Sequence, residues 1–202
     1  MRKAVITGYG IVSSIGIGKD AVLESLKVGR SGIVAEPDFI EKGMRSQVAS
    51  MVNIDFKDYI DRRDLRFMGD AAAYSYIAMK EAIEMSGLEE KDVSNERTGL
   101  IVGSGGGSTK TTVDSADILR TKGVKRIGPY AVTKAMSSTT SACLATPFKI
   151  KGVSYSVSSA CATSAHCIEA ACDEIMLGRH DIIFAGGGEA ADWTIACLFD
   201  GM

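Results

Sequence analysis

Residues 98–108 read TGLIVGSGGGS, and this stretch decides the fold of the 202-residue chain. Its first five residues form an apolar run on both faces, which is typical of a strand in a sheet covered by helices on both sides. Two similar runs, Lys3–Thr7 and Asp181–Ala185, also end in glycine or small residues. A fourth run, Val153–Val157, alternates more in polarity and predicts a less buried strand.

Helical patterns lie between these runs. Asp70–Ser86 carries a broad apolar stripe and stops at Gly87, and Ala162–Leu177 spaces its apolar residues about 3.6 apart and stops at Gly178. Strands that alternate with helices predict a largely parallel, layered α/β fold. Because no linker or repeat interrupts the pattern, we expect residues 1–202 to form one domain.

The composition excludes several classes of protein. With 46% hydrophobic residues, 24% charged residues and a net charge of −2, the chain is neither disordered nor a basic nucleic-acid binder. No apolar run approaches the roughly 18 residues that span a bilayer, and the N-terminus lacks a signal-peptide pattern. Five cysteines without paired spacing favour a reducing compartment. We therefore expect a cytoplasmic protein with neither a nucleic-acid nor a membrane partner.

Two glycine loops resemble nucleotide-binding motifs in part. Thr7–Ser13 begins like a dinucleotide fingerprint, but Ser13 replaces the third glycine and no ribose-binding acid follows at the required distance. Gly103–Ser108 lacks the lysine of a phosphate-binding loop. Both loops are better interpreted as close-packed turns, and a nucleotide-binding oxidoreductase is kept as a weaker alternative.

The segment SSACATSAH, residues 158–166, contains the candidate nucleophile, Cys161. A strand is expected to run into Ser158, and a helix to begin at or just after Cys161. The free N–H groups and positive dipole end of such a helix stabilise a thiolate and can hold an oxyanion. The alternative is that Cys161 is a small core residue. The other cysteines are expected to be core residues: Cys143, Cys167, Cys172 and Cys197.

The chain has only two histidines, His166 and His180. His166 lies five residues after Cys161, about 140° around a helix, and is expected to point away from the thiol. His180 falls in a helix-to-strand turn and is expected to be solvated. The sequence therefore offers a nucleophile without an evident base, and no pair of cysteines has the spacing of a zinc site.

The motif CATSAHC at residues 161–167, preceded by SSA, resembles the active-site motif of the elongating β-ketoacyl-acyl-carrier-protein synthases. The opening VITGYGIVSSIG, residues 5–16, is similar to the first strand and loop of that family. Further similar segments are Gly128–Tyr130, Thr133–Met136, Cys143–Ile150 and Phe184–Glu189. Within the family, Gly105–Gly107 and Thr133–Met136 look most like synthase I, rather than synthase II.

The resemblance implies a thiolase-like fold, in which two βαβαβ halves stack in an αβαβα arrangement, usually as a homodimer. The nucleophilic cysteine belongs to the first half, and two catalytic histidines and a lysine belong to the second. The chain is therefore expected to be the N-terminal half, with the C-terminal half absent.

The implied reaction is a decarboxylative Claisen condensation of acyl- with malonyl-acyl-carrier protein in fatty-acid elongation. An acyl group on Cys161 is the covalent intermediate, and no metal, nucleotide or nicotinamide is implied. The chain alone is expected to be inactive in condensation, because the residues that promote decarboxylation are not in it. The alternative is a non-catalytic acyl- or carrier-binding subunit of a condensing-enzyme pair, although such subunits characteristically lack the cysteine.

A basic stretch favours an acidic carrier protein as partner. Residues 118–168 contain seven lysines and arginines and no acidic residue, in a chain of net charge −2. The resemblance places carrier docking at Arg62, Arg63, Arg66, Lys122 and Lys125. It also places the acyl pocket at Met136 and Phe199, and either of these could simply be a core residue.

Overall fold

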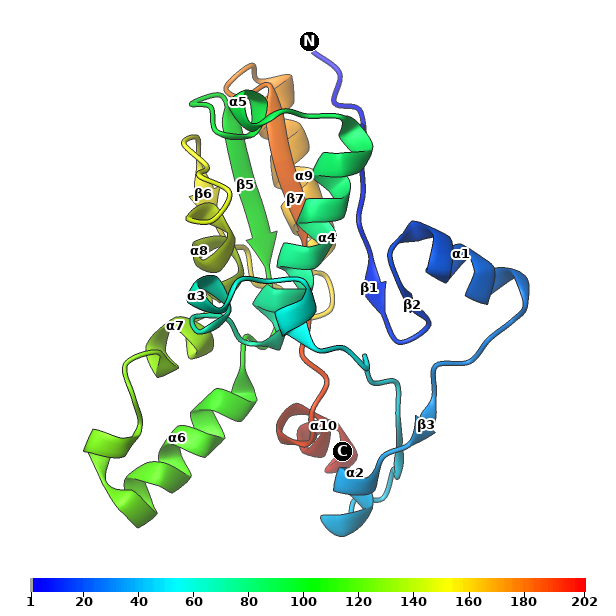
Figure 1. Ribbon diagram of the computed structural model, residues 1–202, viewed down its shortest axis with the longest axis vertical. Helices are drawn as coiled ribbons and strands as arrows, with labels where there is room; N and C mark the ends of the chain where they lie inside the picture. The colour runs from blue at the N-terminus through cyan, green and yellow to red at the C-terminus, as the bar shows by residue number, and fades with distance from the viewer. Residues whose placement is uncertain (1) are drawn as a thin grey trace.

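A computed structural model describes residues 2–202. Its centre is a parallel sheet in which β5 (Thr98–Gly103) lies between β6 (Ser154–Tyr155) and β7 (Ile182–Gly187). All six residues of β5 pair in register with β7, from Thr98 opposite Ile182 to Gly103 opposite Gly187 (Figure 1). The strands expected at residues 98–102, 153–157 and 181–185 are therefore confirmed.

Helices account for most of the remaining regular structure. In chain order they are α1 (Lys19–Lys27), α2 (Pro37–Glu41), α3 (Arg62–Leu65), α4 (Asp70–Ser86), α5 (Glu90–Val93), α6 (Thr109–Lys122), α7 (Ala131–Ala135), α8 (Thr139–Ala145), α9 (Thr163–Met176) and α10 (Trp193–Asp200). Two single 3-10 turns are η1 (Phe56–Asp58) and η2 (Val124–Arg126). Two short antiparallel ladders pair β1 (Val12–Ser13) with β2 (Gly16–Ile17), and β3 (Val34–Ala35) with β4 (Val48–Ala49).

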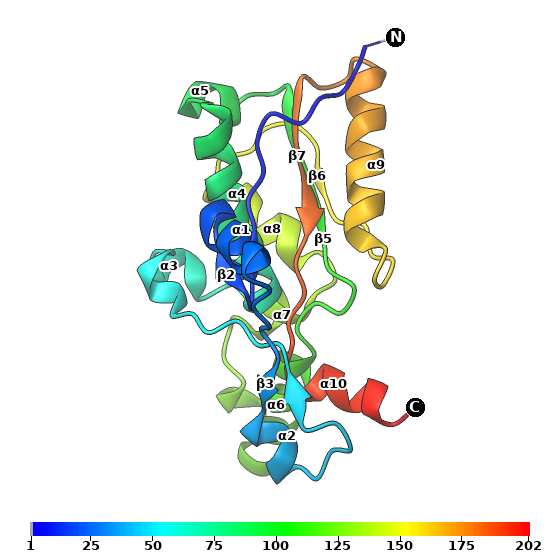
Figure 2. The same cartoon turned by 90° about the vertical axis from the view of Figure 1, so that its right-hand side faces the viewer.

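Alternation along β5 divides the core into two layers. Leu100 and Val102 point to one face, where they pack with residues of α4 and α8. Ile101 points to the other face, against Cys167 and Ala171 of α9. Figure 2 shows α9 on one side of the sheet and α4 and α8 on the other. The sheet is therefore covered on both faces, as its apolar strands predict.

The two helices expected from periodicity are confirmed. Helix α4 begins and ends at the expected residues, and Gly87 closes it in the left-handed conformation with φ of 68°. Helix α9 is one residue shorter at each end than expected, and Gly178 follows it with φ of 72°. Glycine favours this conformation because it has no Cβ to clash with the preceding carbonyl.

The strand expected at Lys3–Thr7 is wrong: residues 2–11 form no ladder with a neighbouring strand. Val5 and Ile6 are 75% and 86% exposed. The adjacent glycines pack closely on α4 instead, since a Cβ at Gly8 would lie 2.3 Å from the Ala82 carbonyl oxygen, and one at Gly10 would lie 1.8 Å from that of Ala78. Close approach to a helix, and not pairing with a strand, accounts for glycine in this segment.

Within residues 2–202, no helix combines the length and the apolar content that crossing a bilayer requires.

Because the backbone is closely packed at the end of β5, we predict that substitution by alanine destabilises the protein at one glycine and not at another. A Cβ at Gly103 would lie 2.0 Å from the Val157 carbonyl oxygen, whereas one at Gly106 would make an ordinary contact of 3.6 Å with Ile195. Gly103→Ala should therefore lower the free energy of unfolding by about 1–3 kcal/mol, as overpacking does. Gly106→Ala, the matched control, should change it little. Urea denaturation measures the free energy of unfolding of both variants, and equal values would contradict the close packing at Gly103.

Candidate active site

Cys161 is exposed and lies directly before Ala162, the N-cap residue of α9. The expected position at a helix N-terminus is therefore confirmed, with the helix beginning two residues after the thiol. The residue before the cysteine, Ala160, adopts a left-handed backbone with φ of 47°. Such a conformation costs an L-residue roughly 1–2 kcal/mol. The turn that presents Cys161 is therefore strained and needs support from its surroundings.

Thr163 supplies hydrogen bonds across this strained turn. Its hydroxyl donates to the Ala160 carbonyl oxygen at 2.8 Å and accepts from the Ser159 N–H at 2.8 Å. The Thr163 side chain is only 2% exposed. A net contribution of about 0.5–1.5 kcal/mol for each bond is comparable to the strain at Ala160. The two bonds therefore help to fix the chain on either side of the cysteine.

No side chain caps the first turn of α9 within residues 2–202. The first regular α-helical bond of this turn runs from the His166 N–H to the Ala162 carbonyl oxygen at 3.1 Å. The N–H groups ahead of it, at Ser164 and Ala165, are therefore open to solvent or to a ligand. This end of the helix also carries the positive end of the dipole. The arrangement can stabilise a thiolate or an oxyanion near Cys161.

The glycine loop after β5 packs against the cysteine turn. A Cβ at Gly105 would lie 2.9 Å from the Ala160 carbonyl oxygen, so only glycine fits there without a shift of the backbone. Glu189, just after β7, holds this loop by accepting from the Gly105 N–H and, at 3.0 Å, from the Ser104 hydroxyl. The Ser104 hydroxyl oxygen accepts in turn from the Gly107 N–H at 3.0 Å. The expectation of a close-packed turn is confirmed.

The other cysteines differ from Cys161 in their surroundings. Cys143 and Cys167 are buried, and burial raises the pKa of both thiols. Cys172 is half-buried. Cys197 is exposed, which corrects its expected core position, but it lies inside α10 and not ahead of a helix. Exposure together with an uncapped helix start distinguishes Cys161.

The expectation that His180 is solvated is wrong. Its side chain is buried, with 8% exposed. Its Nε2 accepts from the Val153 N–H at 3.2 Å, and its Nδ1 lies 3.1 Å from the Glu174 carboxylate. Since Nε2 is the acceptor, Nδ1 carries the proton and donates to Glu174. His180 therefore joins the end of α9 to the strand β6. His166, the other histidine, is exposed on α9.

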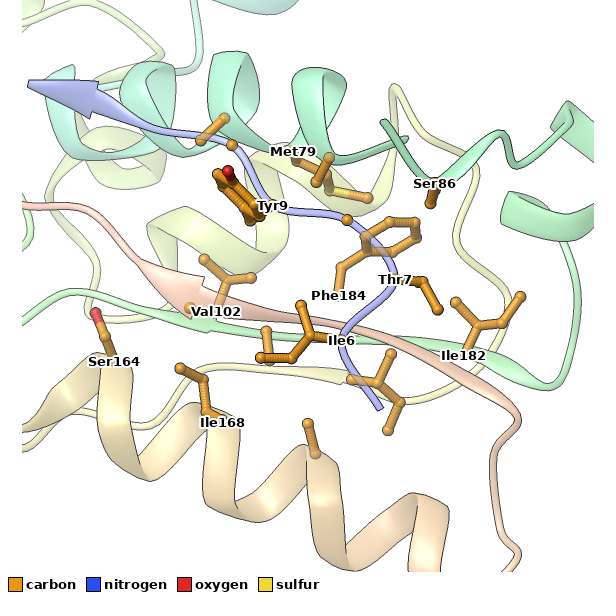
Figure 3. Close-up of a pocket in the computed structure, with 18 of the residues that line it drawn as sticks. Ile6, Thr7, Tyr9, Met79, Ser86, Val102, Ser164, Ile168, Ile182 and Phe184 are labelled. Atoms are coloured by element: carbon orange, nitrogen blue, oxygen red, sulfur yellow. The ribbon is translucent and has the colours of Figure 1, made fainter. Parts of the chain in front are cut away.

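An apolar cavity of about 440 Å³ lies between the N-terminal segment, α4, α9 and β7 (Figure 3). Ile6, Ile168 and Phe184 contribute to its wall, and Ser164 lies at one end of it. A second cavity of about 400 Å³ is lined by serines and by Tyr74, whose pKa burial raises to about 12. Cys161 lines neither cavity.

The two residues expected in an acyl pocket occupy different environments. Met136 is half-buried at the end of α7, and its carbonyl oxygen would lie 3.6 Å from a Cβ at Gly107. Phe199 is 66% exposed on α10. Neither lines the two cavities, and the acyl pocket stays a prediction.

The five expected docking cations fall on two separate stretches of the chain. Arg62 and Arg63 belong to α3 and Arg66 caps it, whereas Lys122 ends α6 and Lys125 lies in η2. Figure 1 shows α6 extending away from the sheet as an arm.

Their local contacts differ as well. Arg63 pairs with Asp61 at 3.1 Å, and the hydrogen bond from Arg63 lowers the pKa of that carboxyl. The Arg66 guanidinium lies 4.8 Å from the centre of the Phe67 ring and 5.5 Å from that of Tyr130. Arg62, Lys122 and Lys125 form no ion pair with any other residue in 2–202. These three are the most available to a partner.

The part of the chain that the structure describes holds no group of three or more histidine, cysteine, aspartate or glutamate side chains that could bind a metal ion.

Comparison with known proteins defines the class. Residues 1–200 match the family described as Beta-ketoacyl synthase, N-terminal domain, and the chain belongs to this family. It is 57% identical to 3-oxoacyl-[acyl-carrier-protein] synthase 1 of Haemophilus influenzae and 55% identical to the enzyme of the same name from Escherichia coli K12. Both alignments cover the whole chain and 50% of the relative, so the chain spans about half the length of these curated relatives.

Solved structures agree on the fold. A β-ketoacyl synthase from Burkholderia phymatum matches with a TM-score of 0.90 at 25% identity, over the whole chain and 50% of the other. The ishigamide ketosynthase/chain length factor matches with a TM-score of 0.88 at 25% identity, over 99% and 50% of the two chains. The expected thiolase-like α/β fold is confirmed.

Two residues of the site, Thr163 and Glu189, were not predicted from the sequence. A threonine two residues after the cysteine, at the start of an expected helix, is a signal for a local hydrogen bond to the backbone. Glu189 gave no comparable signal, because its partners lie 84 and 85 residues earlier in the chain.

The two exposed cysteines provide a direct test of the helix terminus. We expect iodoacetamide to alkylate Cys161 roughly five times faster than Cys197, which corresponds to a helix-terminus interaction with thiolate of up to about 1 kcal/mol. Limiting reagent followed by peptide mapping measures the ratio. Preferential labelling of Cys197, or of the buried thiols, would remove Cys161 as the nucleophile.

Proposed function

We propose that Cys161 accepts an acyl group from an acyl-carrier thioester, and that the protein condenses this group with malonyl-carrier protein in fatty-acid elongation. One observation carries the proposal: the exposed thiol of Cys161 lies directly before the uncapped start of α9, on a turn that the Thr163 hydroxyl stabilises by hydrogen bonds. The names of the relatives, which are 3-oxoacyl-[acyl-carrier-protein] synthases, support the same chemistry.

The first step is a transthioesterification. The Cys161 thiolate attacks the thioester carbonyl carbon, a C–S bond forms, and negative charge develops on the carbonyl oxygen. Donors aimed at that oxygen stabilise the transition state, and the open N–H groups at the start of α9 are of this kind. Collapse of the intermediate breaks the carrier's C–S bond and releases the carrier thiolate, which leaves an acyl-cysteine.

The second step joins two carbon units. Malonyl-carrier protein loses carbon dioxide, and the electron pair of the broken C–C bond forms an enolate. Its carbon attacks the acyl carbonyl and expels the Cys161 thiolate. Neither His166 nor His180 is suited to polarise the malonyl thioester: His166 is exposed, and His180 is committed to Val153 and Glu174. We assign this task to a second half, as in the family.

Residues 1–202 then constitute the N-terminal thiolase-like domain of a larger, cytoplasmic and homodimeric enzyme. The exposed apolar side chains on α10, Leu198 at 63% and Phe199 at 66%, support this proposal because they offer a surface for further protein to cover. The alternative is a non-catalytic subunit, since one matching structure is a ketosynthase/chain length factor. The presence of Cys161 favours the enzyme.

The assignment of decarboxylation to a second half can be tested with a protein limited to residues 1–202. Mixed with malonyl-carrier protein, it should release no carbon dioxide, because neither of its histidines is placed to polarise the malonyl thioester. Supplying the remaining length of a relative should restore release, and Cys161→Ala should abolish acyl-enzyme formation. Carbon dioxide release and the mass of the acylated protein are the two measurements. Turnover by residues 1–202 alone would refute the assignment to a second half.

Carrier docking should depend on charge. Reversal of Arg62 together with Lys125 should slow acyl transfer from the carrier roughly tenfold at low salt, because opposite charges steer the encounter and are screened over about 8 Å at physiological ionic strength. Transfer from a small thioester without the carrier should be unchanged. Reversal of the charge of Lys91, which is exposed on α5, outside the basic stretch of residues 118–168, and paired with Glu89, is the control. Equal losses with both donors would mean that the fold, and not docking, was damaged.

A further inference from the structure

The turn that carries Cys161 is held by one buried hydroxyl group. The Thr163 hydroxyl spans the turn, because it accepts from the Ser159 N–H on the strand side of the cysteine and donates to the Ala160 carbonyl oxygen, each at 2.8 Å. The Thr163 N–H donates to the same carbonyl oxygen at 3.2 Å. Two donors therefore direct the Ala160 carbonyl toward Thr163.

The methyl group of Thr163 has a separate role. A Cβ at Gly103 would lie 2.6 Å from the Thr163 methyl carbon, so this methyl packs on the end of the central strand. Threonine thus joins two functions in one side chain: the methyl anchors the start of α9 to β5, and the hydroxyl bonds to the backbone on both sides of Cys161. A residue with only one of these groups would separate them.

We propose that Thr163 is a positioning residue for the nucleophile: its hydroxyl holds Ala160 in the left-handed conformation and thereby keeps the Cys161 thiol at the start of α9. The inference rests on the proposed function of Cys161. Thr163 does not touch the reacting atoms in this scheme. It acts through the Ala160 carbonyl and the Ser159 amide, and without the hydroxyl the turn relaxes and the thiol leaves the N–H groups that stabilise its charge.

Three substitutions of Thr163 separate the role of the hydroxyl from that of the methyl. Thr163→Val keeps the shape and removes the hydroxyl, whereas Thr163→Ser keeps the hydroxyl and removes the methyl. Thr163→Ala removes both, so the pair of Thr163→Ser and Thr163→Ala isolates the hydroxyl even if Thr163→Val folds poorly. Thr139→Val is the matched control, because Thr139 is also fully buried and its hydroxyl contacts only the Cys143 sulfur, at 3.8 Å.

The readout is the ratio of the iodoacetamide alkylation rates of Cys161 and Cys197 in the same molecules, measured by peptide mapping. Cys197 is exposed on a different helix and serves as an internal reference. The ratio should fall about fivefold, to near unity, in Thr163→Val and Thr163→Ala, because the helix-terminus effect is lost. Thr163→Ser and Thr139→Val should keep the wild-type ratio. A general loss of stability would expose both thiols and would not be rescued by serine.

Acylation by an acyl-carrier thioester provides the second measurement. Variants without the hydroxyl should be acylated more slowly at saturating carrier. The carrier concentration that gives half the maximal rate should not change, because the docking cations lie on other elements. Equal alkylation ratios in Thr163→Ser and Thr163→Ala would overturn the positioning role. If wild-type Cys161 is not acylated at all, the proposed function fails, and the alkylation ratios still decide the role of Thr163.

Discussion

The structure depends on the burial of β5 on both faces. Leu100 and Ile101 are completely inaccessible to solvent although they point in opposite directions. Burial of a large aliphatic side chain contributes about 1.5–3 kcal/mol, and burial on both faces requires a helical layer on each. The positions of α4, α8 and α9 are consequences of this requirement, and so is the position of the cysteine at the start of α9.

The same strand also brings the site together at its carboxyl end. Gly103 ends β5 where Val157 and Thr163 press against its backbone, and the following loop is held by Glu189 from the end of β7. Parallel strands place such ends at one edge of the sheet, where ligands commonly bind in α/β proteins. Cys161 therefore lies among backbone segments from three distant parts of the chain, each fixed by the sheet.

Much of this could be predicted from sequence, because the main signals are local. The spacing of apolar residues, together with the glycine that follows each helix, predicted α4 and nearly all of α9. The prediction of a strand at Lys3–Thr7 was wrong, because an apolar run indicates burial or pairing without specifying a partner. Close contacts of Gly8 and Gly10 with α4 hold this segment against a helix instead. His180 failed for a related reason: its partners, Glu174 and Val153, are set by tertiary structure. Glu189 could not be predicted because its partners lie on a distant loop. The bonds of Thr163 are local, and a threonine at the start of an expected helix is a signal for them.

The pairing of β5 has a consequence for synthesis of the chain on the ribosome. Thr98 finds its partner only at Ile182, and the helix that covers Ile101 begins only at Thr163. While the ribosome makes the intervening residues, β5, which is fully buried in the finished fold, has neither β7 as a neighbour nor α9 as the cover of one face. Non-local parallel pairing of this kind forms slowly and exposes apolar surface in the meantime. The nascent chain thus carries an unprotected strand for most of the time that the second half of these 202 residues is being made.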